Sequence, residues 1–168
     1  LTGLDTVFVV GATANFGSDD TLFCDLGTVN FSDSTTFNEP VTSYSWSFGD
    51  GGTSAQQNPV HLYNNPGLYT VRLIVQTLNG CLDTLTKPNL VAIIQRPLID
   101  IGGDTLICIN NSRAHNGLFI QPDTSVVTWS WTFPNGNNYS VQNPPVQSYT
   151  ASGSFTITAI ATNSTGCK

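Results

Sequence analysis

The sequence predicts an all-β protein built from two tandem β-sandwich modules. Three observations favour this fold: a repeat at about 85 residues, apolar and polar residues that alternate with period two, and turn-forming residues between the alternating stretches. No stretch shows helical periodicity. The chain has 168 residues, so each module is large enough to have a core of its own.

The repeat is carried by aromatic, proline, glycine and cysteine positions that keep their spacing. Trp46 is separated from Pro59 by the same distance along the chain as Trp131 is from Pro144. The other matching positions are Tyr63 and Tyr149, Gly67 and Gly153, and Cys81 and Cys167. Spacing kept over a whole module indicates two copies of one structural unit.

The repeat also sets the module boundaries. We expect a tail of a preceding module or a linker over residues 1–11, a first module over 12–95, and a second over 96–168 that is truncated at its last strand. The opening Leu4–Val7 resembles Leu82–Leu85, which follows the first Gly-Cys. We therefore expect the chain to be a piece of a longer protein; a complete small protein with an unusual start is the alternative.

Strands are predicted in order along each copy. Residues 44–48 and 69–76 alternate aromatic or β-branched residues with polar ones in the first copy, and residues 129–133 and 155–162 do so in the second. The glycine-rich stretch at 49–52 is typical of a turn between strands.

The predicted core motif consists of the large side chains at repeated positions and the aspartate of the first turn. It comprises Trp46, Phe48, Asp50, Tyr63, Tyr69, Trp131, Phe133, Tyr149 and Phe155. A tryptophan on such a strand serves either as a sugar-binding platform or as a core residue. Because Trp46 and Trp131 recur at one position, the core is favoured.

Four cysteines allow three pairings. The repeat selects Cys24 with Cys81 and Cys108 with Cys167, one bridge in each module, at nearly equal separations. Such bridges would indicate an oxidising compartment. Four free thiols are the alternative. Metal binding is disfavoured because no Cys-x-x-Cys motif is present.

The charge excludes some partners. The net charge is -6, with five Lys and Arg residues in all, so a basic surface for nucleic acid or anionic lipid is not expected. No apolar run approaches the roughly 20 residues of a membrane-spanning helix, and we expect no direct membrane insertion.

Several motifs of the first copy together resemble the PKD domain, an immunoglobulin-like β-sandwich. They are Trp46–Gly51, Asn58–Pro59, His61–Tyr63, Pro66–Val71 and Gly80–Cys81. The resemblance covers roughly residues 12–95. The second copy departs from it: Pro134-Asn135-Gly136 replaces Gly-Asp-Gly, Gln147 replaces His61, and Phe155 replaces Tyr69.

The Gly-Cys ending is similar to that of PKD arrays in large surface proteins of Bacteroidetes, including gliding adhesins and type IX secretion substrates. This resemblance implies an extracellular or cell-surface location and a spacer or adhesion module. It also implies O-glycosylation at Asp-Thr/Ser motifs, for which the candidate residues are Thr6, Thr21, Ser34, Thr84 and Thr105.

No catalytic motif is present. His61 and His115 are the only imidazoles, neither recurs in the other copy, and no nucleophile elbow accompanies them. We expect no enzyme activity and no cofactor. Asp19, Asp20 and Asp50 are candidate calcium ligands, although no Asp-x-Asp-x-Asp loop is present.

The leading hypothesis is a spacer or adhesion segment of a large bacterial surface or secreted protein, a semi-rigid rod of disulfide-clamped modules. Its partners would be neighbouring modules of the same chain, surface glycans or other surface proteins. The alternative is an accessory module of a secreted hydrolase that binds polysaccharide or protein.

Overall fold

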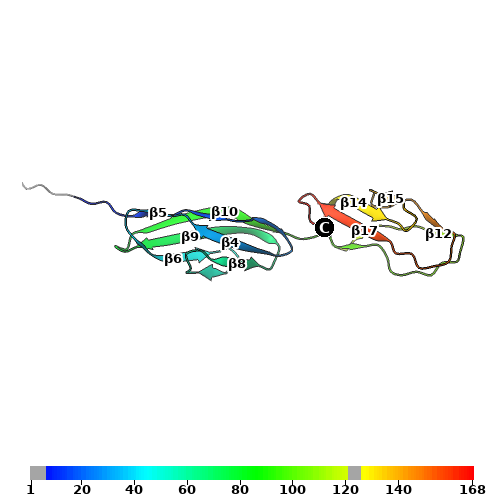
Figure 1. The fold of residues 1–168 in the computed structure, drawn as a ribbon, viewed down its shortest axis with the longest axis horizontal. Helices are drawn as coiled ribbons and strands as arrows, with labels where there is room; N and C mark the ends of the chain where they lie inside the picture. Colours follow the sequence, from blue (N-terminus) through cyan, green and yellow to red (C-terminus); the bar gives the residue numbers. More distant parts are fainter. Residues whose placement is uncertain (1–6, 121–125) are drawn as a thin grey trace, which may run out of the picture. The chain divides into compact units, whose positions relative to one another are not determined.

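A computed structural model describes residues 7–120 and 126–168, and within these ranges every regular element is a strand. The all-β prediction is therefore confirmed. The chain divides into two compact units, Leu1–Ile94 (unit 1) and Gln95–Lys168 (unit 2). Each is described by itself (Figure 1). In the described part of the chain, no helix is long and apolar enough to cross a membrane.

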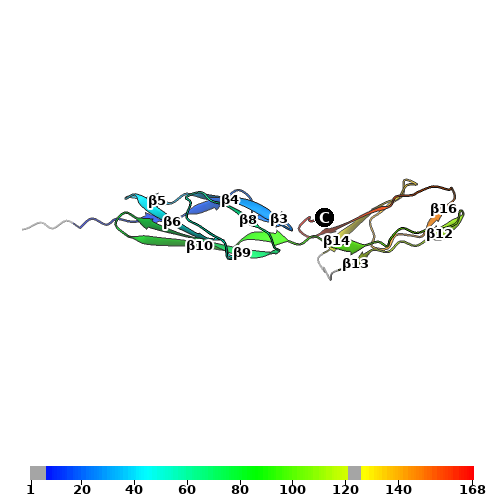
Figure 2. The same ribbon diagram turned by 90° about the horizontal axis from the view of Figure 1, so that it is seen from below.

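Unit 1 is a sandwich of two principal sheets (Figures 1 and 2). Its strands are β1 (Ala12–Thr13), β2 (Phe16–Ser18), β3 (Leu22–Cys24), β4 (Gly27–Asp33), β5 (Thr36–Phe37), β6 (Val41–Ser47), β7 (Thr53–Ser54), β8 (Val60–Tyr63), β9 (Gly67–Thr77) and β10 (Leu82–Ile94). One sheet has the order β3-β10-β9-β6-β7 and the other the order β2-β4-β8, while β1 pairs with β5.

Strand β10, the last strand of unit 1, pairs with β3 from the N-terminal part of the unit as well as with its sequence neighbour β9. It pairs antiparallel with β9 along most of its length, and its last residues pair in parallel with β3, with Ile94 opposite Cys24. The register with β9 shifts between Lys87 and Val91, which marks a bulge. Strand β6 pairs only with Arg72–Thr77 of β9, so the first half of β9 is paired with β10 alone.

The core of unit 1 lies between the two sheets, where every second side chain of a strand points inward. Trp46 is almost fully buried and packs edge-to-face on Phe16 from the opposite sheet, with ring centroids 5.0 Å apart. The other core side chains are Ala14, Val29, Phe31, Phe48, Tyr63, Val71, Leu73, Val75, Val91 and Ile93. The alternation read from the sequence predicted the inward positions of β6 and β9.

Unit 2 repeats this plan with fewer paired residues. Its strands are β11 (Ile99–Asp100), β12 (Asn111–Arg113), β13 (Leu118–Phe119), β14 (Val126–Thr132), β15 (Asn138–Tyr139), β16 (Gln147–Tyr149) and β17 (Thr158–Asn163). They form the sheet β15-β14-β17 and the pairs β11-β13 and β12-β16. Trp129, Trp131, Phe133 and Ala161 make the buried core.

The strand predicted over residues 155–162 is wrong at its start, because β17 begins at Thr158. Phe155, predicted to be in the core, is 40% exposed. Its counterpart Tyr69 pairs with Val91 of β10. Residues 154–157 belong to no described strand, whereas Tyr69 lies within β9.

The predicted disulfides are also wrong. Cys81 and Cys108 are free thiols, whereas Cys24 and Cys167 are disulfide-bonded, so neither unit contains the expected internal bridge. The reason lies in β10. Cys24 is opposite Ile94 at one end of this strand, and Cys81 immediately precedes Leu82 at the other. At about 3.3 Å per residue these ends lie roughly 40 Å apart, far beyond the Cα separation of a disulfide.

Candidate functional site

The turn between β6 and β7 is the part of unit 1 in which polar and aromatic side chains converge. The Phe48 N–H donates to the Gly52 carbonyl at 3.1 Å, which closes the turn. Gly49 has a φ of 90°, a conformation that only glycine adopts without strain. A Cβ at this position would lie 2.6 Å from the Thr70 carbonyl oxygen, so the sequence needs glycine here for space as well.

This turn presents Asp50 to His61 on β8. The Asp50 Oδ2 and His61 Nε2 atoms are 2.7 Å apart, and the Gly52 N–H donates to Asp50 Oδ1 at 2.9 Å. The two side chains are 22% and 18% exposed. Burial acts to raise the pKa of Asp50, but the hydrogen bonds from His61 and Gly52 outweigh it and leave that pKa below its usual value.

An aromatic stack holds His61 in position. The ring of His61 stacks on the ring of Phe48 and packs edge-to-face with Tyr63. Tyr63 in turn stacks on Tyr69, with ring centroids 4.6 Å apart. The Tyr63 hydroxyl donates to the Phe48 carbonyl at 3.0 Å. Burial raises the pKa of Tyr63, and the nearby Asp50 charge raises it further.

In unit 2 two amide side chains replace Asp50 and His61. Asn135 and Gln147 hold the positions of Asp50 and His61, and Asn135 Nδ2 donates to Gln147 Oε1 at 3.4 Å. The turn is otherwise the same: the Asn137 N–H donates to Asn135 Oδ1 at 3.0 Å, as Gly52 does to Asp50. The arrangement thus persists without the carboxylate and the imidazole, as expected of a structural element.

The tryptophans also match between units. The Trp46 indole donates to the Gln56 carbonyl at 2.8 Å, and the Trp131 indole donates to the Val141 carbonyl at 2.9 Å. Both rings are buried, so neither offers a platform for a sugar. The prediction that these residues belong to the core is confirmed.

A family model described as the PKD domain matches residues 12–93 and again residues 94–168. The chain belongs to the PKD domain family. Unit 1 is its first PKD domain and unit 2 is its second.

Relatives of the two PKD domains include collagenases. Collagenase ColA of Bacillus cereus is 35% identical over 107 residues, 63% of this chain. A microbial collagenase of Vibrio alginolyticus is 35% identical over 92 residues, 54% of this chain. The chain spans 11% of the length of each of these relatives.

Solved structures that resemble this chain include the PKD1 domain of Vibrio anguillarum Epp. It has 30% identity and a TM-score of 0.43, and the match covers 49% of this chain and 94% of the Epp domain. A carbohydrate-binding module of the β-sandwich superfamily has 13% identity and a TM-score of 0.50 over 88% of this chain and 83% of that one. At that identity the likeness shows the fold alone.

His115 of the second PKD domain is buried. It packs edge-on against Phe133, and its Nε2 lies 3.0 Å from the Tyr149 hydroxyl. Burial, with a smaller effect of the Arg113 charge, lowers the pKa of His115. The two histidines of the chain each belong to one PKD domain and are fixed by aromatic neighbours.

The candidate calcium ligands Asp19, Asp20 and Asp50 do not form one cluster, because each is engaged in separate hydrogen bonds. Asp19 binds the backbone and side-chain amides of Asn30, and Asp20 caps the Thr21 N–H, while Asp50 is engaged by His61. Within residues 7–120 and 126–168, no three His, Cys, Asp or Glu side chains lie where they could hold a metal ion.

Of the candidate glycosylation residues, Ser34, Thr84 and Thr105 are exposed and Thr21 is half-buried. Thr6 lies outside the described residues. Three hydroxyls are thus open to modification.

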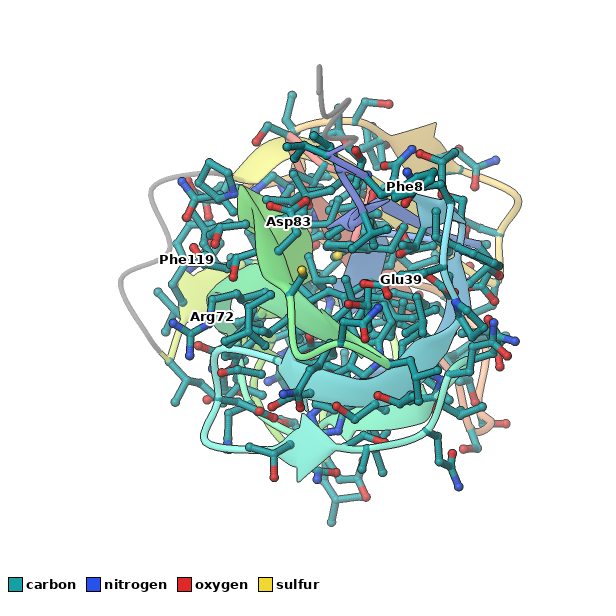
Figure 3. The ribbon with its side chains drawn as sticks, turned by 90° about the vertical axis from the view of Figure 1, so that its left-hand side faces the viewer. Phe8, Glu39, Arg72, Asp83 and Phe119 are labelled. Carbon is teal, nitrogen blue, oxygen red and sulfur yellow. The ribbon has the colours of Figure 1, made fainter. Side chains whose placement is uncertain are left out.

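Sequence reasoning missed two features of the first PKD domain. The first is the Asp50–His61 pair, whose signal was that both residues change together in the second copy. The second is Glu39, which is 8% exposed: Oε2 accepts from Asn79, whereas Oε1 has no hydrogen-bond partner among the described residues. Figure 3 shows Glu39 and Phe8 from the end of this domain at which they lie.

Proposed function

We propose that the two PKD domains are non-catalytic spacers in a larger extracellular protein, which keep neighbouring domains apart under mechanical load. The observation that carries this proposal is the parallel pairing of β3 with the end of β10 in unit 1. These strands lie near the beginning and the end of the folded unit.

Parallel terminal strands resist force in a particular way. A pull that reaches β3 from the N-terminal side and β10 from its C-terminal end draws the two strands in opposite directions along their common axis, so their hydrogen bonds are loaded together. Antiparallel strands pulled from one end would separate one bond at a time. The Ala92 N–H donates to the carbonyl of Thr21, the residue just before β3, at 2.7 Å.

The chemistry of the described residues also supports a spacer. The shared turn pairs Asp50 with His61 in one unit and two amides in the other, and the largest aromatic side chains are buried. Groups that would bind a substrate or a sugar are instead used to hold strands together. Only 10% of the residues are charged, which leaves a surface of Thr, Ser, Asn and Gly.

A second candidate is an accessory module of a secreted peptidase that binds fibrous protein. The similarity to two collagenases, each 35% identical, favours it. Exposed apolar side chains on the edge strands, among them Val60 and Leu62 of β8, would supply contacts to such a partner.

Single-molecule stretching under reducing conditions tests the spacer. Unfolding of Ala12–Ile94 should release roughly 280 Å of chain, since each residue adds about 3.4 Å. Ala92→Pro removes the amide that binds Thr21 and should lower the unfolding force, whereas Ala92→Gly, which keeps that amide, should lower it much less. Equal forces in the two variants would contradict the proposal.

Collagen binding tests the second candidate. Sedimentation of the 168-residue chain with insoluble collagen fibrils should show retention that Val60→Asp and Leu62→Asp abolish, with Leu68→Asp as an exposed control on another strand. If the chain stays in the supernatant with fibrils in excess, the binding role fails and the spacer role is unaffected.

A further inference from the structure

The peptide bonds that follow Lys and Arg residues fall into two classes in this chain. Four of the five basic residues, Arg72, Lys87, Arg96 and Arg113, precede another residue of the sequence. Lys87 is followed by Pro88, and Arg96 is followed by Pro97. The sequence has nine prolines among 168 residues, so a proline after two of these four basic residues is more than composition predicts.

The two basic residues without a following proline lie in paired strands. Arg72 lies within β9, which pairs there with both β10 and β6, and the next residue, Leu73, is fully buried. Arg113 is half-buried and lies opposite Gln147 of β16. A peptidase acts on an extended segment that has left its own sheet, so these bonds become cleavable only when the unit opens. The fold itself therefore protects them.

The bond after Arg96 has no such protection. Residues 95–98 belong to no described strand, and the Arg96 side chain is exposed. The segment lies directly after Ile94, where the chain passes from unit 1 to unit 2. Exposed connections between compact units are preferred sites of proteolytic nicking. An exposed arginine in this segment would make it the first point of attack for a peptidase that cleaves after basic residues.

The bond after Lys87 lies at the bulge of β10. The register with β9 is kept at Lys87 and resumes at Val91, so Pro88 and Asn89 lie outside the ladder, and both are exposed. Among the basic residues of unit 1, Lys87 is thus the one whose following bond is not covered by pairing with β9. Its side chain is held nonetheless, because the amine donates to the Phe16 carbonyl.

Proline makes both of these bonds poor substrates. A serine peptidase with a pocket for Lys or Arg must protonate the nitrogen of the leaving amine while the scissile bond breaks. In proline this nitrogen carries the pyrrolidine ring in place of a hydrogen, and the ring holds φ at about −65°. The ring therefore hinders both the fit of the segment and the proton transfer. The two prolines follow the two basic residues whose bonds the strand ladders leave uncovered.

We propose that this chain withstands serine peptidases that cleave after Lys and Arg, with proline protecting the bonds that the fold leaves accessible. Pro97 matters most, because a cut after Arg96 would separate the two PKD domains along the chain. The inference goes beyond the spacer role, since it names a class of enzyme and the residues that exclude it.

Digestion of the folded 168-residue chain with trypsin tests the proposal. The wild type should stay intact on a reducing gel, whereas Pro97→Ala should be cut after Arg96 into residues 1–96 and 97–168. Adding Arg96→Gln to Pro97→Ala should restore the intact band, which would exclude unfolding as the cause of cleavage. Pro66→Ala is the matched control, because Pro66 is exposed and follows an asparagine. Wild type that is cut after Arg96, or Pro97→Ala that is as resistant as wild type, would overturn the proposal.

The same assay tests the bulge. Pro88→Ala should be cut after Lys87, but more slowly than Pro97→Ala is cut after Arg96, because the Lys87 amine must first leave the Phe16 carbonyl. An uncut Pro88→Ala would overturn the role of Pro88. Cleavage after Arg72 or Arg113 should appear only at urea concentrations that unfold the chain, and cleavage there in the folded wild type would contradict protection by paired strands. No readout of this assay depends on load or on a ligand, so its failure would leave the spacer role untouched.

Discussion

The imidazole of His61 lies parallel to the ring of Phe48, with centroids 4.1 Å apart and planes 11° apart, while its Nε2 binds Asp50. One side chain thus ties the turn after β6 to β8 by packing and by a hydrogen bond. In unit 2 the amide of Gln147 makes the corresponding link without a charge. The two units should therefore respond differently to pH.

Asp50→Asn tests this difference. The pKa of Asp50 is lowered in the folded unit, so its contribution to stability is present above the pKa of the unfolded chain, near 4, and is lost as pH falls below that through the folded value. The variant should be less stable at neutral pH and lose part of this acid sensitivity. Hydrogen exchange of peptides from residues 41–63 measures it, with Asp104→Asn as the exposed control; parallel acid profiles of wild type and variant would contradict the assignment.

Gly49→Ala should destabilise unit 1 more than Gly51→Ala does. Both glycines have a positive φ, 90° at Gly49 and 96° at Gly51, so both substitutions add backbone strain of about 1 kcal/mol or more. Only at Gly49 would the new Cβ also meet the Thr70 carbonyl, whereas nothing lies within 4 Å at Gly51. Urea unfolding of the two variants provides the comparison, and equal midpoints would show that the Thr70 contact relaxes at no cost.

Tyr63→Phe should lower the free energy of unfolding by about 1 kcal/mol, since the buried Phe48 carbonyl loses its donor. Because burial raises the pKa of Tyr63, the folded unit keeps this phenol neutral. Its stabilising contribution is complete below the unfolded pKa, near 10, and is lost at higher pH. Alkaline difference absorbance should show one fewer late-titrating tyrosine in the variant; an unchanged titration would contradict the burial of Tyr63.

Alkylation of the unreduced protein should modify Cys108 and Cys81 and leave Cys24 and Cys167 unmodified. Cys108 should react faster than the half-buried Cys81. Peptide masses after a short and a long exposure to iodoacetamide measure both points. If neither Cys81 nor Cys24 were alkylated, the result would instead support the Cys24–Cys81 disulfide that the repeat predicted.

Much of unit 1 could be predicted because its signals are local. The alternation around Trp46 and Phe48 reports which face of β6 is buried, and the glycines at 49–52 report a turn. These features depend on residues that are adjacent in sequence, and they came out as expected.

The errors all concern β10. The repeat showed that Cys24 matches Cys108 and Cys81 matches Cys167, but it could not show that Cys24 and Cys81 lie at opposite ends of a 13-residue strand. Phe155 was assigned to the core by analogy with Tyr69, which lies in β9 and pairs with Val91 of β10, a residue distant in sequence. Partners distant in sequence decided both outcomes.

Strand β10 ends at the residue where unit 1 stops, and both of its neighbours precede it in the same stretch. A gene segment copied from Ala12 to Ile94 would therefore encode a self-sufficient fold wherever it was inserted. A segment of the same length copied from one Gly-Cys to the next would carry β10 away from β3 and β9. A single copy moved into an unrelated protein therefore keeps its fold only if the cut falls after this strand.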